Sequence, residues 1–186
     1  RLSGLFPGGA VGLDLRLSLL RVARRLLDGD VAEVRLRLEG SRLAPIRVAP
    51  AERPAGPVTL VLGDAMAPPF LAESFPVVAA VSLLDTVPDP LFVLGQLDAL
   101  VAPGGLLLLA TPYSWEPDIT PPDQWWSTPE TTGAEFLVDA LLGRRPELPH
   151  LRYERLEEDD NLPWGLPGHG RLVHRFGLHA VLARKS

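Results

Sequence analysis

The sequence predicts an α/β fold whose sheet is doubly wound and mostly parallel. Short apolar segments typical of strands alternate along the chain with segments whose apolar residues recur at helical spacing. Some of the strand segments, such as "FPVVAAVSLLD", are almost continuously apolar, which is typical of parallel strands covered on both faces. Ligands bind at the carboxyl ends of strands in such sheets, so every loop that follows a strand is a candidate for a site.

The first part of the chain predicts a strand, a helix and then a hairpin. "RLSGLF" is typical of the end of a helix, and "AVGLDL" is a short apolar strand that closes on an acid. A helix follows in "SLLRVARRLLDGD", where Ser18 can cap the first turn and Gly29 can end the last one. "EVRLRLEG" alternates like a solvent-facing strand, and "SRLAPIRV" can return as its partner around Glu39 and Gly40.

The remaining segments predict buried strands in alternation with helices, and then two late strands. "VTLVLGDA" and "FPVVAAVSLLD" are the next strands, and a helix starts after Asp89 and Pro90 and ends at a Pro-Gly-Gly sequence. "LLLLATP" is a further buried strand, "AEFLVDALLG" is a helix, and "HLRYERLEE" and "RLVHRFGLHAVLARK" supply the late strands. The helix after Asp89 has one apolar face, which comprises Leu91, Leu94, Leu97, Leu100 and Val101.

Length and composition narrow the classes of protein. The chain has 186 residues, and we expect a single domain over residues 1–186. The net charge of −5 argues against nucleic acid as a partner, and no apolar run approaches the roughly 20 residues that span a bilayer. The sequence has no cysteine, which excludes disulfides, thiolate metal sites and a cysteine nucleophile. We therefore expect a cytoplasmic, bacterial protein that acts on a small molecule and has no membrane partner.

The histidines do not predict a metal site. His169, His174 and His179 follow one another at intervals of five residues, which places them on a common face of neither a helix nor a strand. His150 stands apart from them. His169 and Asp160 are candidates for a general base, but the sequence assigns no catalytic residue.

Three loops that follow predicted strands carry candidate ligand-binding residues. Asp14 can accept two hydrogen bonds from a ribose diol, or it can serve as an acid near the start of the next helix. Asp64 can bind an exocyclic amine while Ala65 packs on a purine face, or it can stabilise a turn. The loop that contains Ser82 and Leu83 can present backbone groups to a ligand, or it can simply lead into the capped helix.

The middle of the chain resembles a known family. The sequence "GDAMAPPF…SFPVVAAVSLLDTVPDPLFVLGQLDALVAPGGLLLLATP" looks like that of class I S-adenosylmethionine-dependent methyltransferases, in particular the small-molecule type called type 11. In that family Gly-Asp-Ala follows the third strand and Pro-Gly-Gly precedes the fifth. The usual Asp before the fourth strand is Pro76 here, and the resemblance covers about residues 10–112.

This resemblance implies a fold, a methyl donor and a set of binding residues. The fold is the Rossmann-like methyltransferase fold, and the methyl donor is S-adenosylmethionine. Asp14 matches the acid on the ribose hydroxyls, Asp64 and Ala65 match the contacts to the adenine edge, and Ser82 and Leu83 match the loop below the methionine and adenosine parts. The residues implied to bind the donor are Asp14, Leu15, Asp64, Ala65, Ser82 and Leu83.

A second resemblance concerns the Pro-rich loop 111–133. "TPYSWEPDITPPDQWWS" is similar to the segment after the fifth strand in the methyltransferase domain of ovothiol synthases, which methylate a ring nitrogen of a thiol-bearing histidine. We therefore expect Tyr113, Trp115 and Trp125 to bind the methyl acceptor. The long aromatic loop can close over a small substrate as a lid, or its rings can simply pack on the core.

The first strand of the family and its Gly-rich turn have no counterpart in this sequence. We expect the sequence to be N-terminally incomplete relative to the family, or to be that of a short protein with an incomplete sheet and weakened donor binding. The predicted function is S-adenosylmethionine-dependent methyl transfer to a small metabolite, such as an imidazole nitrogen of a mercaptohistidine-like compound. A non-catalytic methyltransferase-fold binding partner is the main alternative. A nicotinamide-dependent dehydrogenase is a third possibility, for which the G-x-G-x-x-G fingerprint is missing.

Overall fold

The computed structural model describes residues 8–50 and 56–186, which fall into two compact units. The first unit contains the described residues up to Pro69 together with Leu166–His174. The second unit contains Phe70–Gly165 and Arg175–Ser186. The helix end expected in "RLSGLF" lies outside the described residues.

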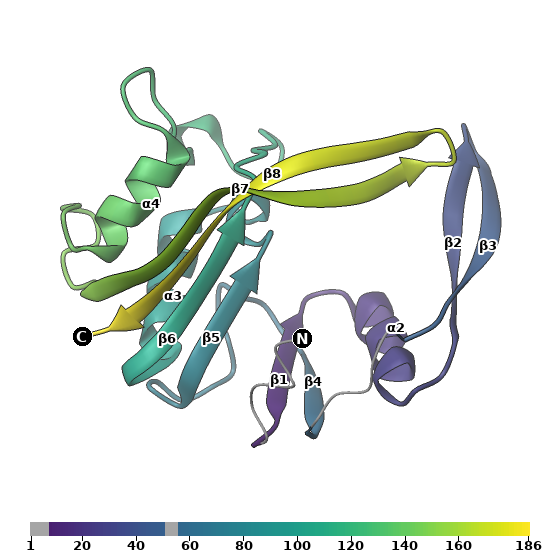
Figure 1. Ribbon diagram of the computed structural model, residues 1–186, viewed down its shortest axis with the longest axis horizontal. Coiled ribbons are helices and arrows are strands. Elements are labelled where there is room, and N and C mark those ends of the chain that lie inside the picture. The colour runs from purple at the N-terminus through teal and green to yellow at the C-terminus, as the bar shows by residue number, and fades with distance from the viewer. Residues whose placement is uncertain (1–7, 51–55) are drawn as a thin grey trace. The chain divides into compact units, whose positions relative to one another are not determined.

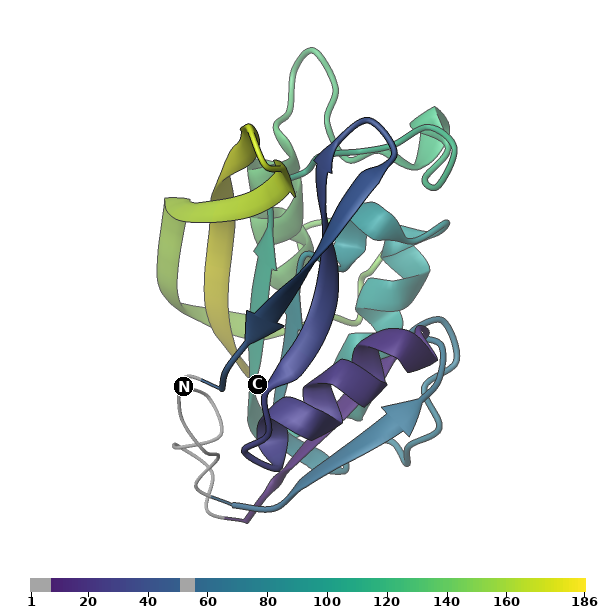
Figure 2. The ribbon, with the colours of Figure 1, turned by 90° about the vertical axis from the view of Figure 1, so that its right-hand side faces the viewer.

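A pair of short parallel strands and one helix form the centre of the first unit. Strand β1 (Ala10–Asp14) pairs in parallel with β4 (Val58–Leu62), so that Asp14 lies opposite Leu62. Helix α2 (Leu17–Leu27) contacts β4 and also β2 (Ala32–Glu39), the strand that follows the helix in the chain. Figure 2 shows the helix lying beside these strands. The predicted strand–helix order of this region is confirmed.

The start of helix α2 differs from the prediction. Ser18 is not its cap, because the helix begins at Leu17 and Arg16 is the cap residue. The chain turns immediately after β1, where Oδ1 of Asp14 accepts a hydrogen bond from the Arg16 amide at 2.7 Å. This turn starts the helix before Ser18, which therefore lies inside the first turn. Gly29 follows the helix with a φ of 87°, as expected of a residue that ends one.

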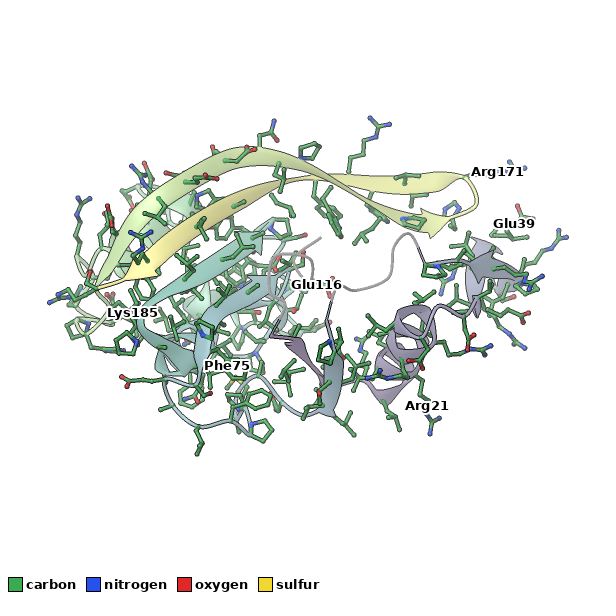
Figure 3. All side chains as sticks on the ribbon, turned by 60° about the horizontal axis from the view of Figure 1, so that its bottom comes forward. Arg21, Glu39, Phe75, Glu116, Arg171 and Lys185 are labelled. Carbon is green, nitrogen blue, oxygen red and sulfur yellow. The ribbon has the colours of Figure 1, made fainter. Side chains whose placement is uncertain are left out.

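The first unit also contains an antiparallel hairpin. Strands β2 (Ala32–Glu39) and β3 (Arg42–Val48) pair around Gly40, whose φ is 50°. This confirms the predicted turn. The backbone amide of Gly170 donates to the carbonyls of Arg37 and Leu38 at 3.0 and 3.1 Å. Gly170 belongs to the turn between the last two strands of the chain. Figure 3 labels one residue at each turn, Glu39 at the turn of the hairpin and Arg171 at the turn of the last two strands.

The second unit is built on a four-stranded sheet. Its strands are β5 (Phe75–Val81), β6 (Val101–Thr111), β7 (Tyr153–His169) and β8 (Leu172–Lys185), of which the stretch Leu166–His174 belongs to the first unit. The order in space is β5-β6-β8-β7, as Figure 1 shows. Strands β5 and β6 are parallel, whereas β8 runs antiparallel to β6 and places His179 opposite Thr111. The predicted α/β fold is confirmed, and its two parallel strand pairs lie in separate units.

Two helices complete the second unit. Helix α3 (Pro90–Leu100) packs on β5 and β6, and its start is capped by the side chain of Asp89, as predicted. Helix α4 (Gly133–Leu141) starts with a capping box between Thr132 and Glu135. Two short 3₁₀ helices are also present. The first, η1 (Leu84–Thr86), follows β5, and the second, η2 (Pro122–Gln124), lies within loop 111–133.

The Pro-Gly-Gly sequence does not end helix α3. The helix stops at Leu100, and β6 begins at the next residue, Val101. Pro-Gly-Gly therefore lies inside β6, where the pairing with β5 is irregular and Gly104 has a φ of 72°. A Cβ on Gly105 would lie 2.7 Å from the Ala102 carbonyl oxygen, so this irregular stretch needs glycine.

Nearly all of the buried apolar side chains belong to the second unit. In the described part of the first unit only Leu20 and Ala32 are buried. The core of the second unit lies between its sheet and helices, and its largest fully buried side chains are Leu84, Leu94, Leu107, Leu109, Leu137, Leu141, Leu151 and Leu178. No helix among the residues described is long and apolar enough to cross a membrane.

Candidate functional site

The first unit brings two of the predicted donor-binding residues to one edge. Asp14 is the last residue of β1, and Asp64 lies two residues after the parallel strand β4. The amide of Gly63 donates to the Asp14 carbonyl at 3.2 Å, which holds the two strand ends together. Both carboxylates therefore follow the carboxyl ends of neighbouring parallel strands, where such sheets bind ligands.

Each of these carboxylates is oriented by the backbone that follows it. Oδ1 of Asp14 accepts from the Arg16 amide, and Oδ1 of Asp64 accepts from the Met66 amide at 2.8 Å. One oxygen of each carboxylate is thus fixed in a turn, and the second oxygen has no hydrogen-bond donor in the described parts of the chain. Leu15 is 68% exposed beside Asp14, and Ala65 follows Asp64 in the turn. This geometry suits acceptance of hydroxyl or amine hydrogens from a ligand.

The second unit has strained backbone directly after each of its parallel strands. Ser82 follows β5 with a φ of 49°, and Tyr113 lies two residues after β6 with a φ of 53°. The Ser82 amide donates to the Ala110 carbonyl at 2.7 Å, and the Tyr113 amide donates to Oγ1 of Thr111 at 3.3 Å. Left-handed backbone costs roughly 1–2 kcal/mol at a non-glycine residue, and such strain is concentrated at functional sites.

The side chain of Tyr113 belongs to a hydrogen-bonded chain of three residues. Its hydroxyl lies 2.8 Å from Nδ1 of His179, whose ring is buried at 2% exposure. Nε2 of the same histidine lies 3.0 Å from Oε1 of Glu158. The other oxygen of Glu158 pairs with Arg155. The chain therefore runs from the loop after β6 through β8 to β7, and it ends at an ion pair.

The pKa of Tyr113 is raised above the ordinary range of tyrosine. Burial of the phenol is the largest cause, and the negative charges of Asp160, Glu158 and Asp85 add to it. Each of these causes disfavours a phenolate. Tyr113 therefore stays a neutral phenol that can donate one proton and accept another.

A buried carboxylate lies beside this chain. Asp85 comes from η1, directly after β5, and is 2% exposed. Its Oδ2 accepts a hydrogen bond from the Ser114 amide at 2.8 Å. Its Oδ1 is buried and has no partner among the described residues. A buried, unpaired carboxylate oxygen is costly, and such an atom indicates a ligand position when it lies next to other candidate groups.

Three aromatic residues of loop 111–133 form one cluster. The ring centroids of Tyr113, Trp115 and Trp126 lie 5.8–6.4 Å apart, and Trp126 stacks on Phe136 of α4 at 5.2 Å. The indole nitrogens of Trp115 and Trp126 are buried without a hydrogen-bond acceptor in the residues described. By contrast, Trp125 donates its indole N–H to the Thr120 carbonyl at 2.8 Å.

The structure thus places the predicted substrate residues unequally. Tyr113 and Trp115 lie in the aromatic cluster, and the indole N–H of Trp115 has no acceptor among the described residues. The indole N–H of Trp125, by contrast, forms a hydrogen bond within the loop. Trp126, which the sequence analysis did not select, is the more buried of the two adjacent tryptophans.

Three polar residues of this site were missed by sequence reasoning. Asp85 had a signal, because it is an acid that follows a strand predicted to be parallel. His179 lies among alternating apolar residues, but nothing in the sequence shows which neighbour it meets. Glu158 is one of four consecutive acids, of which the sequence analysis selected Asp160, and no pattern points to Glu158.

Comparison with known proteins assigns the chain to a family. The model of the methyltransferase domain of type 11 matches residues 6–109, which is more than half of the chain. The chain belongs to this family of S-adenosylmethionine-dependent methyltransferases, which confirms the first resemblance. The sequence matches none of the curated proteins.

Solved structures agree on the fold. An S-adenosylmethionine-dependent methyltransferase from Methanosarcina mazei is 15% identical with a TM-score of 0.58, and the match covers 95% of this chain and 82% of that one. An S-adenosylmethionine-dependent methyltransferase from Mesorhizobium loti is 14% identical with a TM-score of 0.50, and the match covers 94% and 79% of the two chains. At these identities the likeness concerns the fold alone.

Proposed function

We propose that this chain binds S-adenosylmethionine and transfers its methyl group to a ring nitrogen of a small imidazole, such as a mercaptohistidine-like compound. The family match over residues 6–109 is the observation that carries methyl transfer in general. The identity of the acceptor rests on the chemistry of the second unit and on the resemblance of its loop to the ovothiol synthase domain.

The predicted donor-binding residues fit the chemistry of this methyl donor. Each of Asp14 and Asp64 has a carboxylate oxygen beyond the one fixed in its turn, and these oxygens can accept from ribose hydroxyls and from an adenine amine. Leu15 and Ala65 offer apolar surface beside them. Ser82 and Leu83, in the loop after β5, would lie below the methionine and adenosine parts of the donor. When bound, S-adenosylmethionine supplies an electrophilic methyl group on a sulfonium.

The polar and aromatic groups near Tyr113 support an imidazole as the acceptor. A heteroaromatic ring can pack among Tyr113 and Trp115, and a polar hydrogen elsewhere on the compound, such as one on its amino group, can be donated to a buried acceptor. Oδ1 of Asp85 is such an acceptor without a partner in the described chain. Positioning of the ring nitrogen toward the methyl group accounts for much of the rate in such transfers.

Calorimetric titration with S-adenosylhomocysteine is the first test. We expect micromolar affinity for the wild-type chain. Asp14→Ala should weaken binding by roughly 10–100-fold, since it removes a hydrogen bond to a charged group worth about 1.5–3 kcal/mol. Asp28→Ala is the matched control, because it removes an exposed carboxylate of the same unit that pairs with Arg24 on the helix surface.

Methyl transfer is then tested with S-adenosylmethionine and 5-mercaptohistidine, and the product is identified by mass spectrometry. A ring-methylated product supports the proposal. If the folded chain binds S-adenosylhomocysteine but forms no product with any small imidazole, the acceptor is wrong and the non-catalytic alternative gains support. If it does not bind the nucleoside at all, donor binding by the described residues is refuted.

A further inference from the structure

We infer that Tyr113 takes up the proton that the methyl acceptor loses and passes its own proton to His179, with Glu158 holding the resulting charge. This inference rests on the proposed function, because it names how the same site handles its substrate. It assigns a catalytic role to Tyr113 and positioning and charge-holding roles to the two residues behind it. It also restricts the acceptor to compounds that carry a transferable proton, such as an N–H azole.

The hydrogen bonds fix the direction in which this chain can move a proton. A carboxylate can only accept, so Nε2 of His179, at 3.0 Å from Glu158, carries the ring proton. Nδ1 of the neutral ring then has a lone pair that accepts the hydroxyl proton of Tyr113 at 2.8 Å. With its proton directed at His179, the phenol oxygen presents its lone pairs away from the histidine. An N–H donor of a ligand can use those lone pairs.

The proposed step balances in atoms and charge. One ring nitrogen of the neutral acceptor forms a bond to the methyl carbon, while the carbon–sulfur bond of S-adenosylmethionine breaks and its electron pair stays on sulfur. The proton on the other ring nitrogen moves to the oxygen of Tyr113, and the phenol proton moves to Nδ1 of His179. The products are a neutral methylated ring, a neutral thioether and an imidazolium at His179 beside the Glu158 carboxylate.

The surroundings of Tyr113 favour a relay over a stored phenolate. Burial and the nearby acids raise the pKa of the phenol, so a free phenolate is disfavoured, and a phenol that gains one proton as it loses another avoids that state. The charged groups around the phenol are Glu158 and Asp160 from β7 and Asp85 from η1, and all three are acids. Their negative charges oppose a phenolate, but they stabilise the cation that forms on His179.

A matched pair of tyrosine variants tests the relay. Tyr113→Phe should lower kcat for 5-mercaptohistidine by roughly 10²–10⁴-fold, which is the usual range for loss of acid–base catalysis. Tyr153→Phe is the control, because Tyr153 also donates to a buried acid, Oδ1 of Asp98 at 2.8 Å, but lies in a different cluster. The control should keep the wild-type kcat, and both variants should bind S-adenosylhomocysteine as the wild type does.

The kinetic parameter that changes separates a relay from a packing role. Glu158→Gln removes the negative charge beside Nε2 of His179, at 3.0 Å, where the relay places the resulting cation. It should therefore lower kcat and leave KM for 5-mercaptohistidine unchanged. A chain of residues that only packs against the substrate would show the change in KM instead.

A spectroscopic measurement tests the relay without turnover. Nitrogen-15 NMR of the histidine rings in the free chain should show His179 with its proton on Nε2, and Tyr113→Phe should shift the Nδ1 resonance. A proton found on Nδ1 in the neutral ring would overturn the relay.

The outcomes for the relay and for the proposed function are distinguishable. A wild-type chain that forms no methylated product overturns the proposed function, and the relay with it. A wild-type chain that is active while Tyr113→Phe retains full kcat overturns the relay alone.

Discussion

Two buried tyrosine clusters in the second unit differ in how completely their polar atoms are paired. At the amino end of β6, Tyr153 donates to Asp98 at 2.8 Å, and Nζ of Lys185 lies 3.1 Å from the same carboxylate. Lys185 also donates to the carbonyls of Asp98 and Val101. Figure 3 labels Lys185 on the side of the sheet where β5 begins at Phe75. This first cluster, Tyr153–Asp98–Lys185, joins α3, β6, β7 and β8.

The second cluster, Tyr113–His179–Glu158 with Asp85, lies at the carboxyl end of β6. Among the described residues, Oδ1 of Asp85 has no partner, and neither do the buried indole N–H groups of Trp115 and Trp126, whose rings lie against Tyr113. Both tyrosines have a pKa above the ordinary range, with burial as the largest cause, so this pKa alone does not distinguish the clusters. The difference in pairing does, because the polar atoms of the first cluster are paired within the chain, whereas the second leaves donors and acceptors that a ligand can use.

The largest effect on stability is expected from a substitution in the first cluster. Asp98→Asn removes the charge that pairs with Lys185, a side chain that is only 18% exposed. We expect the free energy of unfolding to fall by about 3 kcal/mol, since a largely buried cation is left without its partner. Urea unfolding followed by circular dichroism measures this. A loss below about 1 kcal/mol would show that the first cluster is not a structural staple.

The next effect concerns the position of Tyr113. A Cβ on Gly133 would lie 2.6 Å from Cδ1 of Tyr113, so Gly133→Ala should displace the ring. We expect kcat to fall by roughly 10–100-fold, because small misplacements of a catalytic group are costly. Gly95→Ala is the control, since a Cβ there meets open space on α3. Equal activity in both variants would contradict a requirement for this ring position.

An Asp→Asn substitution in the second cluster should affect substrate binding more than stability, unlike Asp98→Asn in the first. Asp85→Asn keeps an oxygen that can accept from the Ser114 amide, and it removes a buried charge with an unpaired oxygen. We expect the free energy of unfolding to change by less than about 1 kcal/mol, while KM for the acceptor rises roughly tenfold. Steady-state kinetics and urea unfolding of one preparation measure both. A strongly destabilised variant with unchanged KM would make the two clusters alike.

The smallest effect lies at the start of α4, outside both clusters. Hydrogen bonds from the amide and hydroxyl of Thr132 lower the pKa of Glu135 below its ordinary value of 4.5. The stabilisation is therefore fully present above that ordinary value and is lost as the pH falls through the lowered one. Glu135→Gln should reduce the drop in Tm between pH 6 and pH 3, as measured by calorimetry. An unchanged drop would remove Glu135 from the acid response.

The sequence was informative where local pattern decides structure. Alternating strands and helices predicted the fold, and acids after strands placed Asp14 and Asp64 at one edge. Ser18 was misassigned because a side chain two residues before the helix, Asp14, already forms the turn that starts it. Local pattern also suggested Pro-Gly-Gly as a helix stop, although the bulge it forms within β6 depends on pairing with β5.

The polar chain behind Tyr113 could not be predicted in this way. His179 meets Tyr113 because β8 pairs antiparallel with β6 in a register that sets His179 opposite Thr111. Glu158 meets His179 through the pairing of β7 with β8. These registers are decided by long-range packing, and a shift of one residue would reverse every side chain. The aromatic density of loop 111–133 and its resemblance to the ovothiol synthase segment were the two signals that pointed in advance to Tyr113 as a candidate site residue.

The strand order β5-β6-β8-β7 has a consequence for how the second unit folds. β8 follows β7 in the chain but lies between β7 and β6, so β7 and β8 complete the sheet by docking β8 on β6. Until they dock, the edge of β6 along Leu106–Leu109 has no partner on that side and is open to wrong association. Docking joins segments far apart in sequence, which makes it a slow event. The same event brings His179 to Tyr113, so the ability to move a proton would appear only with the completed sheet.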